Sequence, residues 1–422
     1  MSTSSSRSGS PAASGWPGTA PTATPPGAAG YKSPAVRDIG VYIHFPYCLS
    51  KCPYCDFASR AEKVIPQERY TRAVLSELRA RAPEFPGRRA VSIYFGGGTP
   101  SLWDPEQVDA VLREVRALFE VAPSAEITLE ANPGTTDEAR FSAFRASGVN
   151  RLSIGVQSFA APQLVALGRQ HSGGDAVRAY RTARAAGFEN VSLDLIHGAE
   201  GQTEQGAGSD AAAAVALGPE HVSCYALTLT GLAEEVPMAK AVRRGELHLP
   251  DDEAQAAMGD AVRGELRRAG YARYEISNYA RPGYEAVHNS LYWRGLEYAA
   301  AGCGACGFRR LSGGAAVARR WMNDRSPERY LERVEATGLG EAQSEELGAD
   351  EHLRERLFTG LRLARGLDLG ALEDDLRLPV RSRFAPQIDR LQREGLAELD
   401  GTTLRLTEAG LDLHSEVALR FF

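Results

Sequence analysis

The sequence predicts an α/β protein whose parallel sheet is either doubly wound or curled into a partial (β/α) barrel, followed by a helical C-terminal region. Two observations predict this architecture. From residue 39 to about residue 275, short β-branched runs alternate with segments of helical periodicity, which is typical of parallel sheets. Beyond about residue 346 the helical pattern dominates.

Six short runs are the predicted strands. They are mostly apolar rather than cleanly alternating, as expected of strands that are buried on both faces. The runs span residues 41–45, 91–95, 126–129, 152–156, 191–196 and 222–227.

Two of the intervening helices carry clear start signals. Asp104 is expected to cap the helix after the second strand, because Gln107 stands three positions later at capping-box spacing. The apolar residues between 108 and 119 then fall three or four positions apart and share one helix face. Ser172 and Asp175 are expected to open a later helix in the same way.

The ends of the chain differ in composition from the alternating region. Among the first 30 residues, all except Met1, Arg7 and Trp16 are Ser, Thr, Pro, Gly or Ala, a composition that predicts a disordered tail. The predicted division of the chain is a low-complexity tail at 1–38, a barrel domain at 39–275, a connecting segment at 276–345 and a helical domain at 346–422.

The last part of the chain suggests a small winged-helix-like module. A helix is expected at 381–394, then two short strands around Asp400 and Gly401, then a helix that begins after Thr407. Residues 375–422 carry seven Arg against eight acidic side chains, so no basic surface for nucleic acid is expected there. Packing is the expected role of this module.

Composition excludes several classes of protein. The 422 residues carry a net charge of −6, so there is no general basic excess for polyanions, and no apolar run is long enough to span a bilayer. Six Cys in a chain of this length are too few for a disulfide scaffold and suit a reducing compartment, which predicts a cytoplasmic protein.

Half of these cysteines cluster after the first predicted strand. Cys48, Cys52 and Cys55 fall within eight residues, on a segment that two prolines break into turns. A structural zinc site would need a fourth ligand, for which His44 is close in the sequence. Three thiolates alone suit a 4Fe–4S cluster that keeps one iron open for another ligand.

Polar residues also follow the later strands. A glycine run with Gly97 and Gly98 follows the second strand and can bring backbone N–H groups close to a ligand. Glu130 follows the third strand, Gln157 follows the fourth, and Asp194 lies in the fifth. Because the working face of such a barrel is at the carboxyl ends of its strands, these residues are expected to share one site.

The run from Tyr42 to Phe57, YIHFPYCLSKCPYCDF, resembles the opening of radical S-adenosylmethionine (SAM) proteins. The resemblance is to the branch that holds the oxygen-independent coproporphyrinogen III dehydrogenases (HemN) and the haem chaperones (HemW), and it covers nearly the whole chain from residue 39. Further matching motifs lie at residues 96–101, 130–133, 155–159, 167–169, 194–196, 288–293 and 360–363.

The resemblance implies a partial (β/α)6 radical-SAM barrel with a HemN-type helical domain at its C-terminus. It implies that Cys48, Cys52 and Cys55 hold a 4Fe–4S cluster whose open iron chelates the amino and carboxylate groups of SAM. It further implies SAM-contacting roles for the matching positions Tyr42, Tyr54, Gly97, Gly98, Thr99, Glu130, Gln157, Arg169 and Asp194. No catalytic residue is assigned.

Within the branch, two features favour the chaperone subgroup. The dehydrogenase subgroup usually carries a further Cys two positions after the third cluster ligand, where this chain has Phe57. The run His288-Asn-Ser-Leu-Tyr292-Trp293 is associated with haem binding in the chaperones, so His288 is a candidate haem ligand. A hydrogen-bonded structural role for the same histidine is the alternative.

The chain also departs from its relatives. Where the family usually has a Gly-x-Gly-Ala-His-Ser stretch, Cys306 replaces the His and forms a Cys-x-x-Cys pair with Cys303. These two cysteines are expected to be small buried residues in a glycine-rich turn, with metal, haem or redox roles as alternatives. His197 stands where the family tends to have Tyr.

The expected function is therefore that of a haem chaperone that binds a 4Fe–4S cluster, SAM and haem and delivers haem to client proteins. The alternative is a coproporphyrinogen III dehydrogenase that decarboxylates propionates oxidatively. The expected partners are haem or porphyrin, a haem-accepting client and an electron donor, with no nucleic acid and no membrane span.

Overall fold

The computed structural model describes residues 37–135, 137–231, 235–312 and 315–422 of the chain. The predicted disordered tail at 1–38 lies outside these residues except for its last two positions, and Asp38 already begins the first strand, β1 (Asp38–Phe45).

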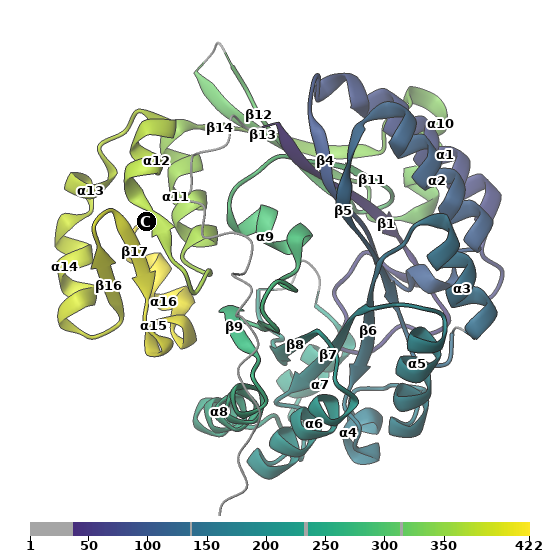
Figure 1. The fold of residues 1–422 in the computed structure, drawn as a ribbon, viewed down its shortest axis with the longest axis horizontal. Coiled ribbons are helices and arrows are strands. Elements are labelled where there is room, and N and C mark those ends of the chain that lie inside the picture. The colour runs from purple at the N-terminus through teal and green to yellow at the C-terminus, as the bar shows by residue number, and fades with distance from the viewer. Residues whose placement is uncertain (1–36, 136, 232–234, 313–314) are drawn as a thin grey trace, which may run out of the picture. The chain divides into compact units, whose positions relative to one another are not determined.

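A single large sheet forms the centre of the described structure (Figure 1). Its twelve strands follow the order β14-β13-β12-β11-β1-β4-β5-β6-β7-β8-β10-β9, and among the described residues the two edge strands do not pair with each other. The strands besides β1 are β4 (Arg89–Gly97), β5 (Glu120–Ala131), β6 (Arg151–Gln157), β7 (Asn190–His197), β8 (His221–Ala226), β9 (Ala272–Glu275), β10 (Asn278–Ala280), β11 (Tyr298–Ala301), β12 (Cys306–Arg310), β13 (Ala316–Asn323) and β14 (Glu341–Gly348).

The six predicted strands are confirmed as β1 and β4 to β8. They lie side by side in chain order and every neighbouring pair is parallel, as expected of successive β/α units. The sheet stays open at its edges, which fits the predicted partial barrel. Its parallel order brings the carboxyl ends of these strands to one edge.

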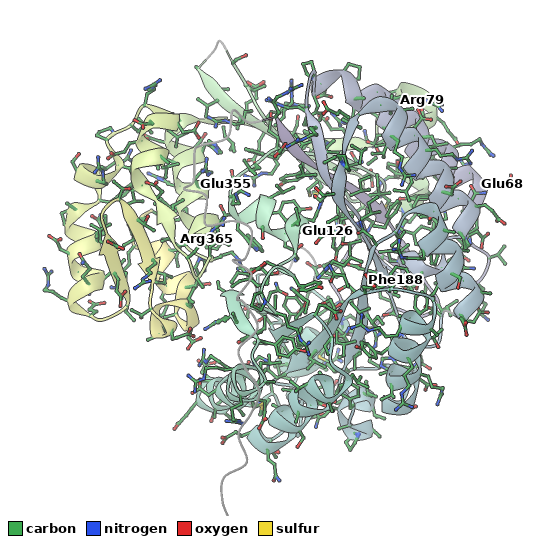
Figure 2. All side chains as sticks on the ribbon, viewed as in Figure 1. Glu68, Arg79, Glu126, Phe188, Glu355 and Arg365 are labelled. Atoms are coloured by element: carbon green, nitrogen blue, oxygen red, sulfur yellow. The ribbon has the colours of Figure 1, made fainter. Side chains whose placement is uncertain are left out.

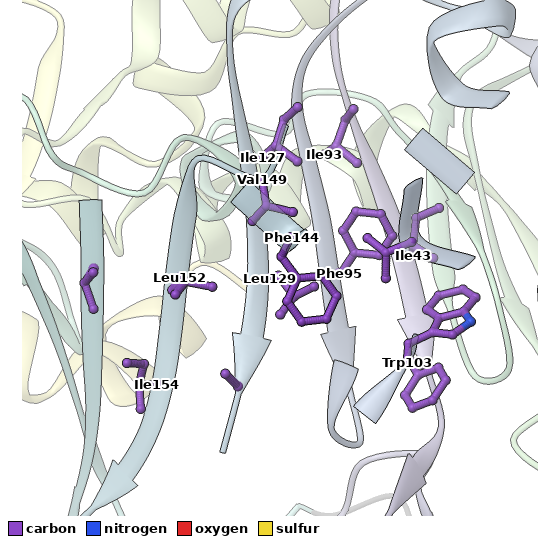
Figure 3. Packing of buried hydrophobic residues seen from close by; sticks show 14 of the residues in the cluster. Ile43, Ile93, Phe95, Trp103, Ile127, Leu129, Phe144, Val149, Leu152 and Ile154 are labelled. Carbon is purple, nitrogen blue, oxygen red and sulfur yellow. The ribbon is translucent and has the colours of Figure 1, made fainter. Parts of the chain in front are cut away.

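The two faces of these strands differ in chemistry. Toward the helices, alternate residues are apolar and buried, and Figure 3 shows Ile43, Phe95 and Leu129 packing there with Trp103 and Phe144. The opposite face carries residues that are largely polar, among them Ser92, Thr128, Arg151, Ser153 and Ser192, and all of these are also buried. The expectation that these strands are buried on both faces is therefore confirmed, although the residues of the inner face are largely polar and form the wall of a polar interior.

Helices cover the outer face and connect the strands. They are α1 (Gln67–Arg81), α2 (Pro105–Leu118), α3 (Glu138–Ser147), α4 (Ala161–Ala166), α5 (Gly173–Ala185), α6 (Glu204–Leu217), α7 (Pro237–Arg243) and α8 (Asp252–Arg268). The capping box of Ser172 and Asp175 at the start of α5 is confirmed. Asp104 does precede α2, but its side chain makes no capping bond and lies 3.4 Å from a guanidinium nitrogen of Arg140 instead.

The predicted connecting segment at 276–345 also builds part of the sheet. It contains β10 to β13, most of β14, and the helices α9 (Val287–Trp293) and α10 (Pro327–Thr337). β11 pairs in parallel with β1, whereas β12, β13 and β14 follow as an antiparallel extension. This extension was not predicted, and its attachment to the sheet through the pairing of β11 with the distant strand β1 leaves no local pattern in the sequence.

The side chain of Glu77 ties α1 to this extension. Its carboxylate is fully buried and accepts hydrogen bonds from Gly302 N, Gly340 N and the Tyr330 hydroxyl at 2.9–3.0 Å. The Asn323 side-chain amide donates to both carboxylate oxygens at 2.9 Å. A buried carboxylate is stable only with such a set of donors, so this cluster holds α1 against the antiparallel extension.

The C-terminal part forms a separate small core. Its helices are α11 (Ala349–Gly360), α12 (Leu369–Leu376), α13 (Val380–Arg383), α14 (Ala385–Arg393), α15 (Glu408–Asp412) and α16 (His414–Leu419), and its strands are β15 (Leu367–Asp368), β16 (Ala397–Asp400) and β17 (Thr403–Leu406). The predicted hairpin is confirmed as β16–β17, and Thr407 caps α15 through its side chain. The predicted helix at 381–394 is broken at Phe384 into α13 and α14.

Candidate functional site

A cavity of about 600 Å³ lies at the carboxyl ends of the parallel strands. Every site residue predicted from the sequence lines it, with the exception of Tyr42 and His288. We call it the cofactor cavity. The sequence-based expectation that polar residues from successive strands share one site is confirmed by this placement.

The three clustered thiols form one wall of the cofactor cavity. Cys48 ends the short strand β2 (Tyr47–Cys48), which pairs with β3 (Arg60–Ala61), and Cys52 and Cys55 lie on the turn between these two strands. The Thr99 hydroxyl lies 3.4 Å from the Sγ of Cys48 and donates to it. Burial raises the pKa of the Cys48 and Cys55 thiols, so a positively charged group is needed to hold them as thiolates.

His44 is not free to complete a zinc site with these thiols. Its Nε2 lies 2.9 Å from the carbonyl oxygen of Ala58 and its Nδ1 lies 3.0 Å from the Tyr42 hydroxyl. Both ring nitrogens are therefore used, and burial lowers the pKa of His44 to about 4. Three thiols without a fourth ligand of this kind fit an iron–sulfur cluster with one open iron.

Glycines after β4 bring the backbone close to the cavity. Gly97 has a φ of +117°, and an added Cβ there would lie 2.6 Å from the His44 ring. A Cβ on Gly98 would lie 2.7 Å from the carbonyl oxygen of Tyr47. The glycine run is thus required by close packing against the cysteine-bearing segment as well as by any ligand.

Glu130 is held at the floor of the cavity by two donors. The Tyr94 hydroxyl donates to it at 2.8 Å and the Gly97 N–H at 3.0 Å. Burial raises the pKa of Glu130 to about 7, so its charge changes near neutral pH.

Arg169 connects the thiols with the opposite wall. One of its nitrogens lies 3.4 Å from the Sγ of Cys52, and another donates to the Asn132 side chain at 2.8 Å and to the Gly155 carbonyl at 2.9 Å. Asn132 in turn donates to the Thr99 hydroxyl at 3.0 Å. Asn132 belongs to the motif at 130–133, but sequence reasoning gave it no role.

The remaining predicted residues complete the cavity. Asp194 accepts hydrogen bonds from the hydroxyls of Ser153 and Ser192 at 2.8–3.1 Å, and burial raises its pKa. Gln157 adopts a left-handed backbone with a φ of +64°, a conformation that costs energy in a residue with a side chain. Tyr54 lies on the cysteine turn, and burial raises the pKa of its hydroxyl.

Tyr42 and His288 lie elsewhere. Tyr42 lines a second cavity of about 500 Å³, described below, and Phe57 lines both cavities. His288 lines neither cavity: its Nδ1 lies 2.8 Å from the Ser92 hydroxyl and its Nε2 lies 2.7 Å from the Tyr292 hydroxyl. The backbone N–H of His288 is bound by Glu126, which is labelled in Figure 2.

The cysteines of the Cys-x-x-Cys pair, Cys303 and Cys306, differ in environment. Cys303 is fully buried, and its N–H donates to the Tyr70 hydroxyl at 2.9 Å, so the packing interpretation is confirmed for it. Cys306 is exposed and lines the second cavity, so the expectation of a buried residue is wrong there. Both are free thiols.

Comparison with known proteins assigns the class of this fold and site. A family profile described as Radical SAM superfamily matches residues 42–209, and a profile described as HemN C-terminal domain matches residues 347–413. The structure matches that of coproporphyrinogen III oxidase (HemN) from Escherichia coli with a TM-score of 0.76 at 23% identity, over 92% of this chain and 90% of that one. The class is thus that of the radical SAM proteins.

Curated relatives narrow this class. The chain is 37% identical to the Heme chaperone HemW of Mycobacterium tuberculosis, over 89% of this chain and 92% of the relative. It is 40% identical to the Escherichia coli HemW, over 71% of this chain and 79% of the relative. It is 33% identical to the mitochondrial radical S-adenosyl methionine domain-containing protein 1 of Bos taurus, over 90% of this chain and 86% of that protein. The chain belongs to the HemW family of radical SAM proteins.

A 4Fe–4S cluster and SAM are the cofactors of this superfamily, and the cofactor cavity fits them. Cys48, Cys52 and Cys55 supply soft thiolate ligands on one wall, and Arg169 lies beside one of them. Separately, no helix among the described residues is long and apolar enough to cross a bilayer.

Proposed function

We propose that this chain is a haem chaperone, which binds haem and transfers it to client proteins. The observation that carries the proposal is the second cavity, which is lined by Tyr292 and Trp293 and adjoins the cofactor cavity at Phe57. Aromatic walls suit a flat, apolar ring system such as a porphyrin. The similarity to relatives named Heme chaperone HemW supports the same function.

We further propose that the residues of the cofactor cavity hold SAM against the cluster. The cluster, when reduced, supplies the electron for cleavage of SAM. Arg169 provides a cation for the SAM carboxylate, Asp194 an acceptor for ribose hydroxyls, and Gly98 close approach of the backbone. Glu130 binds the Gly97 N–H at 3.0 Å and so fixes the turn on which Gly98 and Thr99 stand.

Tyr42 supports this site indirectly. Its hydroxyl lies 3.0 Å from His44 Nδ1, and the His44 ring lies directly against Gly97. Tyr42 thus supports the glycine turn through His44, whereas the sequence resemblance implied a direct contact with SAM.

The expected partners are a haem-accepting client protein and a one-electron donor. A cytoplasmic location is part of the proposal, since six free thiols among the described residues suit a reducing compartment.

Haem transfer tests the proposal. Anaerobically reconstituted protein should bind haem at one per chain and pass it to an apo-haemoprotein faster than free haem equilibrates. The same protein, given SAM, reductant and coproporphyrinogen III, should yield no protoporphyrinogen IX. Turnover of coproporphyrinogen would instead establish the dehydrogenase alternative, and absence of both activities would refute the proposal.

A further inference from the structure

The cofactor cavity contains a second cation that the proposed SAM site does not use. The thiols and Arg169 lie near the carboxyl ends of the strands, whereas Arg151 is the first residue of β6, at the amino end of the strand, and also lines the cavity. Since a strand rises about 3.3 Å per residue, the backbone of Arg151 lies about 13 Å along β6 from Gly155, whose carbonyl binds Arg169. The two guanidinium groups therefore serve opposite ends of the cavity.

The guanidinium of Arg151 is buried without a full set of partners. Its side chain is 3% exposed, and its Nε has no hydrogen-bond partner among the described residues. Its ion pair with Glu126, which Figure 2 labels, has an Nε–O distance of 3.8 Å, too long for a hydrogen bond. A buried polar group in this state calls for an explanation, and an anionic ligand in the cavity supplies one.

The carboxylate of Glu126 is already engaged by another element. Its two oxygens accept hydrogen bonds from the backbone N–H groups of Val287 and His288, each at 3.0 Å, at the start of α9. Although burial opposes the charge of Arg151, the nearby carboxylate of Glu126 raises the pKa of this guanidinium overall, so the side chain stays charged. A charged guanidinium with an unused N–H thus lies at the inner end of the cavity.

The wall near this cation suits an organic molecule. Asn289 lines the cofactor cavity, although Tyr292 and Trp293 of the same helix line the second cavity. Tyr225, near the end of β8, lines the cofactor cavity as well and is 41% exposed. An amide that can donate hydrogen bonds and an open aromatic ring fit a ligand with a polar head and a planar body.

The charges of the cavity select the class of ligand. A planar guanidinium matches the oxygens of a carboxylate or a phosphate. Glu130 and Asp194 line the same cavity, and their carboxylates repel a doubly charged phosphate more strongly than a singly charged carboxylate. SAM carries a single carboxylate, and its proposed place beside Arg169 leaves none for Arg151.

We propose that the inner end of the cofactor cavity, formed by Arg151, Tyr225 and Asn289, is a subsite for a second ligand beside SAM. The ligand is a small organic monocarboxylate, and Arg151 anchors its carboxylate. We call this place the inner subsite. The inference goes beyond haem transfer, which requires no such ligand, and it rests on the proposed position of SAM at Arg169.

Binding of para-fluorophenylacetate tests the inner subsite without any substitution. This probe joins a carboxylate to a planar ring, and fluorine nuclear magnetic resonance follows its binding to the reconstituted, SAM-loaded chain. We expect the probe to bind, propionate to compete with it, and the uncharged para-fluorophenylacetamide to bind at least about tenfold more weakly. SAM should stay bound throughout.

Two substitutions locate the bound probe. Arg151→Gln removes the cation and should weaken binding of the carboxylate roughly tenfold or more, whereas Arg151→Lys should retain part of it. Asn289→Asp adds a negative charge with little change in shape, so it should weaken binding of the carboxylate but not of the amide. Arg145→Gln, at an exposed arginine of α3, is the matched control and should change neither. Iron content and SAM affinity report whether each variant has folded.

Four outcomes would overturn the inner subsite. They are absence of probe binding to a chain that binds SAM, equal affinity for the carboxylate and the amide, release of SAM by the probe, and unchanged affinity in both Arg151→Gln and Asn289→Asp. Stronger competition by inorganic phosphate than by propionate would contradict the assignment of a monocarboxylate. If the reconstituted chain binds no SAM, the proposed function of the cofactor cavity fails instead.

Discussion

The guanidinium of Arg169 lies 3.4 Å from the Sγ of Cys52 and donates a hydrogen bond to it. Hydrogen bonds to cluster sulfurs stabilise the reduced, more negative state and so raise the reduction potential. The same side chain binds Asn132 and Gly155 on the other side of the cavity. Arg169 thus links the electronic state of the cluster to the wall where we place SAM.

Arg169→Lys should lower the reduction potential of the cluster. Lysine keeps the positive charge but lacks the planar guanidinium group, whose nitrogens contact both walls of the cavity. If the lost bond is worth about 1 kcal/mol more to the reduced state, the potential falls by roughly 40 mV. Anaerobic redox titration measures this shift. Arg178→Lys, at an exposed arginine of α5, is the matched control, and an equal shift there would contradict the argument.

Cys52→Ala should lose most of the cluster iron. The reconstituted chain should contain about four iron atoms, and removal of one of three thiolates leaves the cluster with too few ligands. Iron and sulfide analysis measures this. Cys224→Ala removes a buried cysteine of β8 and should keep the full iron content. Zinc in place of iron would refute the cluster assignment.

Glu130→Gln should change how stability depends on pH. The pKa of Glu130 is about 7 in the folded chain and near 4.5 when unfolded, so the native state binds the proton more tightly. Its contribution to the free energy of unfolding is fully present below pH 4.5 and is lost as pH rises through 7. Between pH 5.5 and 8 the loss is about 2 kcal/mol.

Urea unfolding of SAM-free protein at both pH values measures this effect. Buried histidines with lowered pKa values make the protein more stable as pH rises, which is the opposite effect. Because both proteins contain these histidines, the difference between their free energies of unfolding reports Glu130 alone. The variant should gain stability relative to the unmodified chain as pH rises. A difference that does not vary with pH would contradict the raised pKa.

Gly97→Ala should destabilise the chain and weaken SAM binding. Its φ of +117° is unfavourable for any side chain, and the added Cβ would meet the His44 ring at 2.6 Å. Gly87→Ala is the control, since Gly87 has a φ of +66° but nothing within 4 Å of an added Cβ. Both variants should lose about 1–2 kcal/mol of the free energy of unfolding because of their positive φ. Only Gly97→Ala should lose more, because only its Cβ meets the His44 ring.

Thermal unfolding and equilibrium dialysis with labelled SAM distinguish these two contributions. Equal losses of stability would mean that His44 moves aside at little cost. Unchanged SAM binding in Gly97→Ala would remove the glycine turn from the cofactor site.

Glu77→Ala should be strongly destabilising. It leaves four residues with buried donors and no acceptor, a loss of about 3 kcal/mol or more. Glu68→Ala on the same helix is the matched control, and Glu68 is labelled in Figure 2. Its side chain is 82% exposed, so the variant should change stability by less than about 0.5 kcal/mol. Denaturant midpoints under reducing conditions measure both, and similar midpoints would contradict the structural role of Glu77.

Much of the cofactor site could be predicted because its signals are local. The thiols of Cys48, Cys52 and Cys55 lie on one short turn, and strands β1 and β4 to β8 are short runs with clear apolar content. The parallel order of the strands then brings Glu130 and Asp194 to the same edge without further information. Residues far apart in the sequence can be predicted to lie close together when each stands at the end of its own strand in a parallel sheet.

The second cavity could not be predicted in this way. His352 and Phe308 meet only because α11 packs near a strand of the antiparallel extension, and nothing in either segment records that contact. The motif assigned Tyr42 to SAM; in the structure Tyr42 lies on the inner face of β1, stacked on Tyr94, and lines the second cavity. His288 sits in a motif associated with haem, and its contact with Tyr292 lies within that motif on α9, but its contact with Ser92 depends on the packing of α9 against β4.

The Glu77 cluster has a consequence for the order of folding while the chain is being synthesised. The four residues that bind its carboxylate lie 225 to 263 positions later in the sequence. During synthesis, the helix that carries Glu77 emerges long before any of them, so its inner face has no partner for that charge. The cluster can close only after residue 340 has left the ribosome, so its closure is a late event in folding.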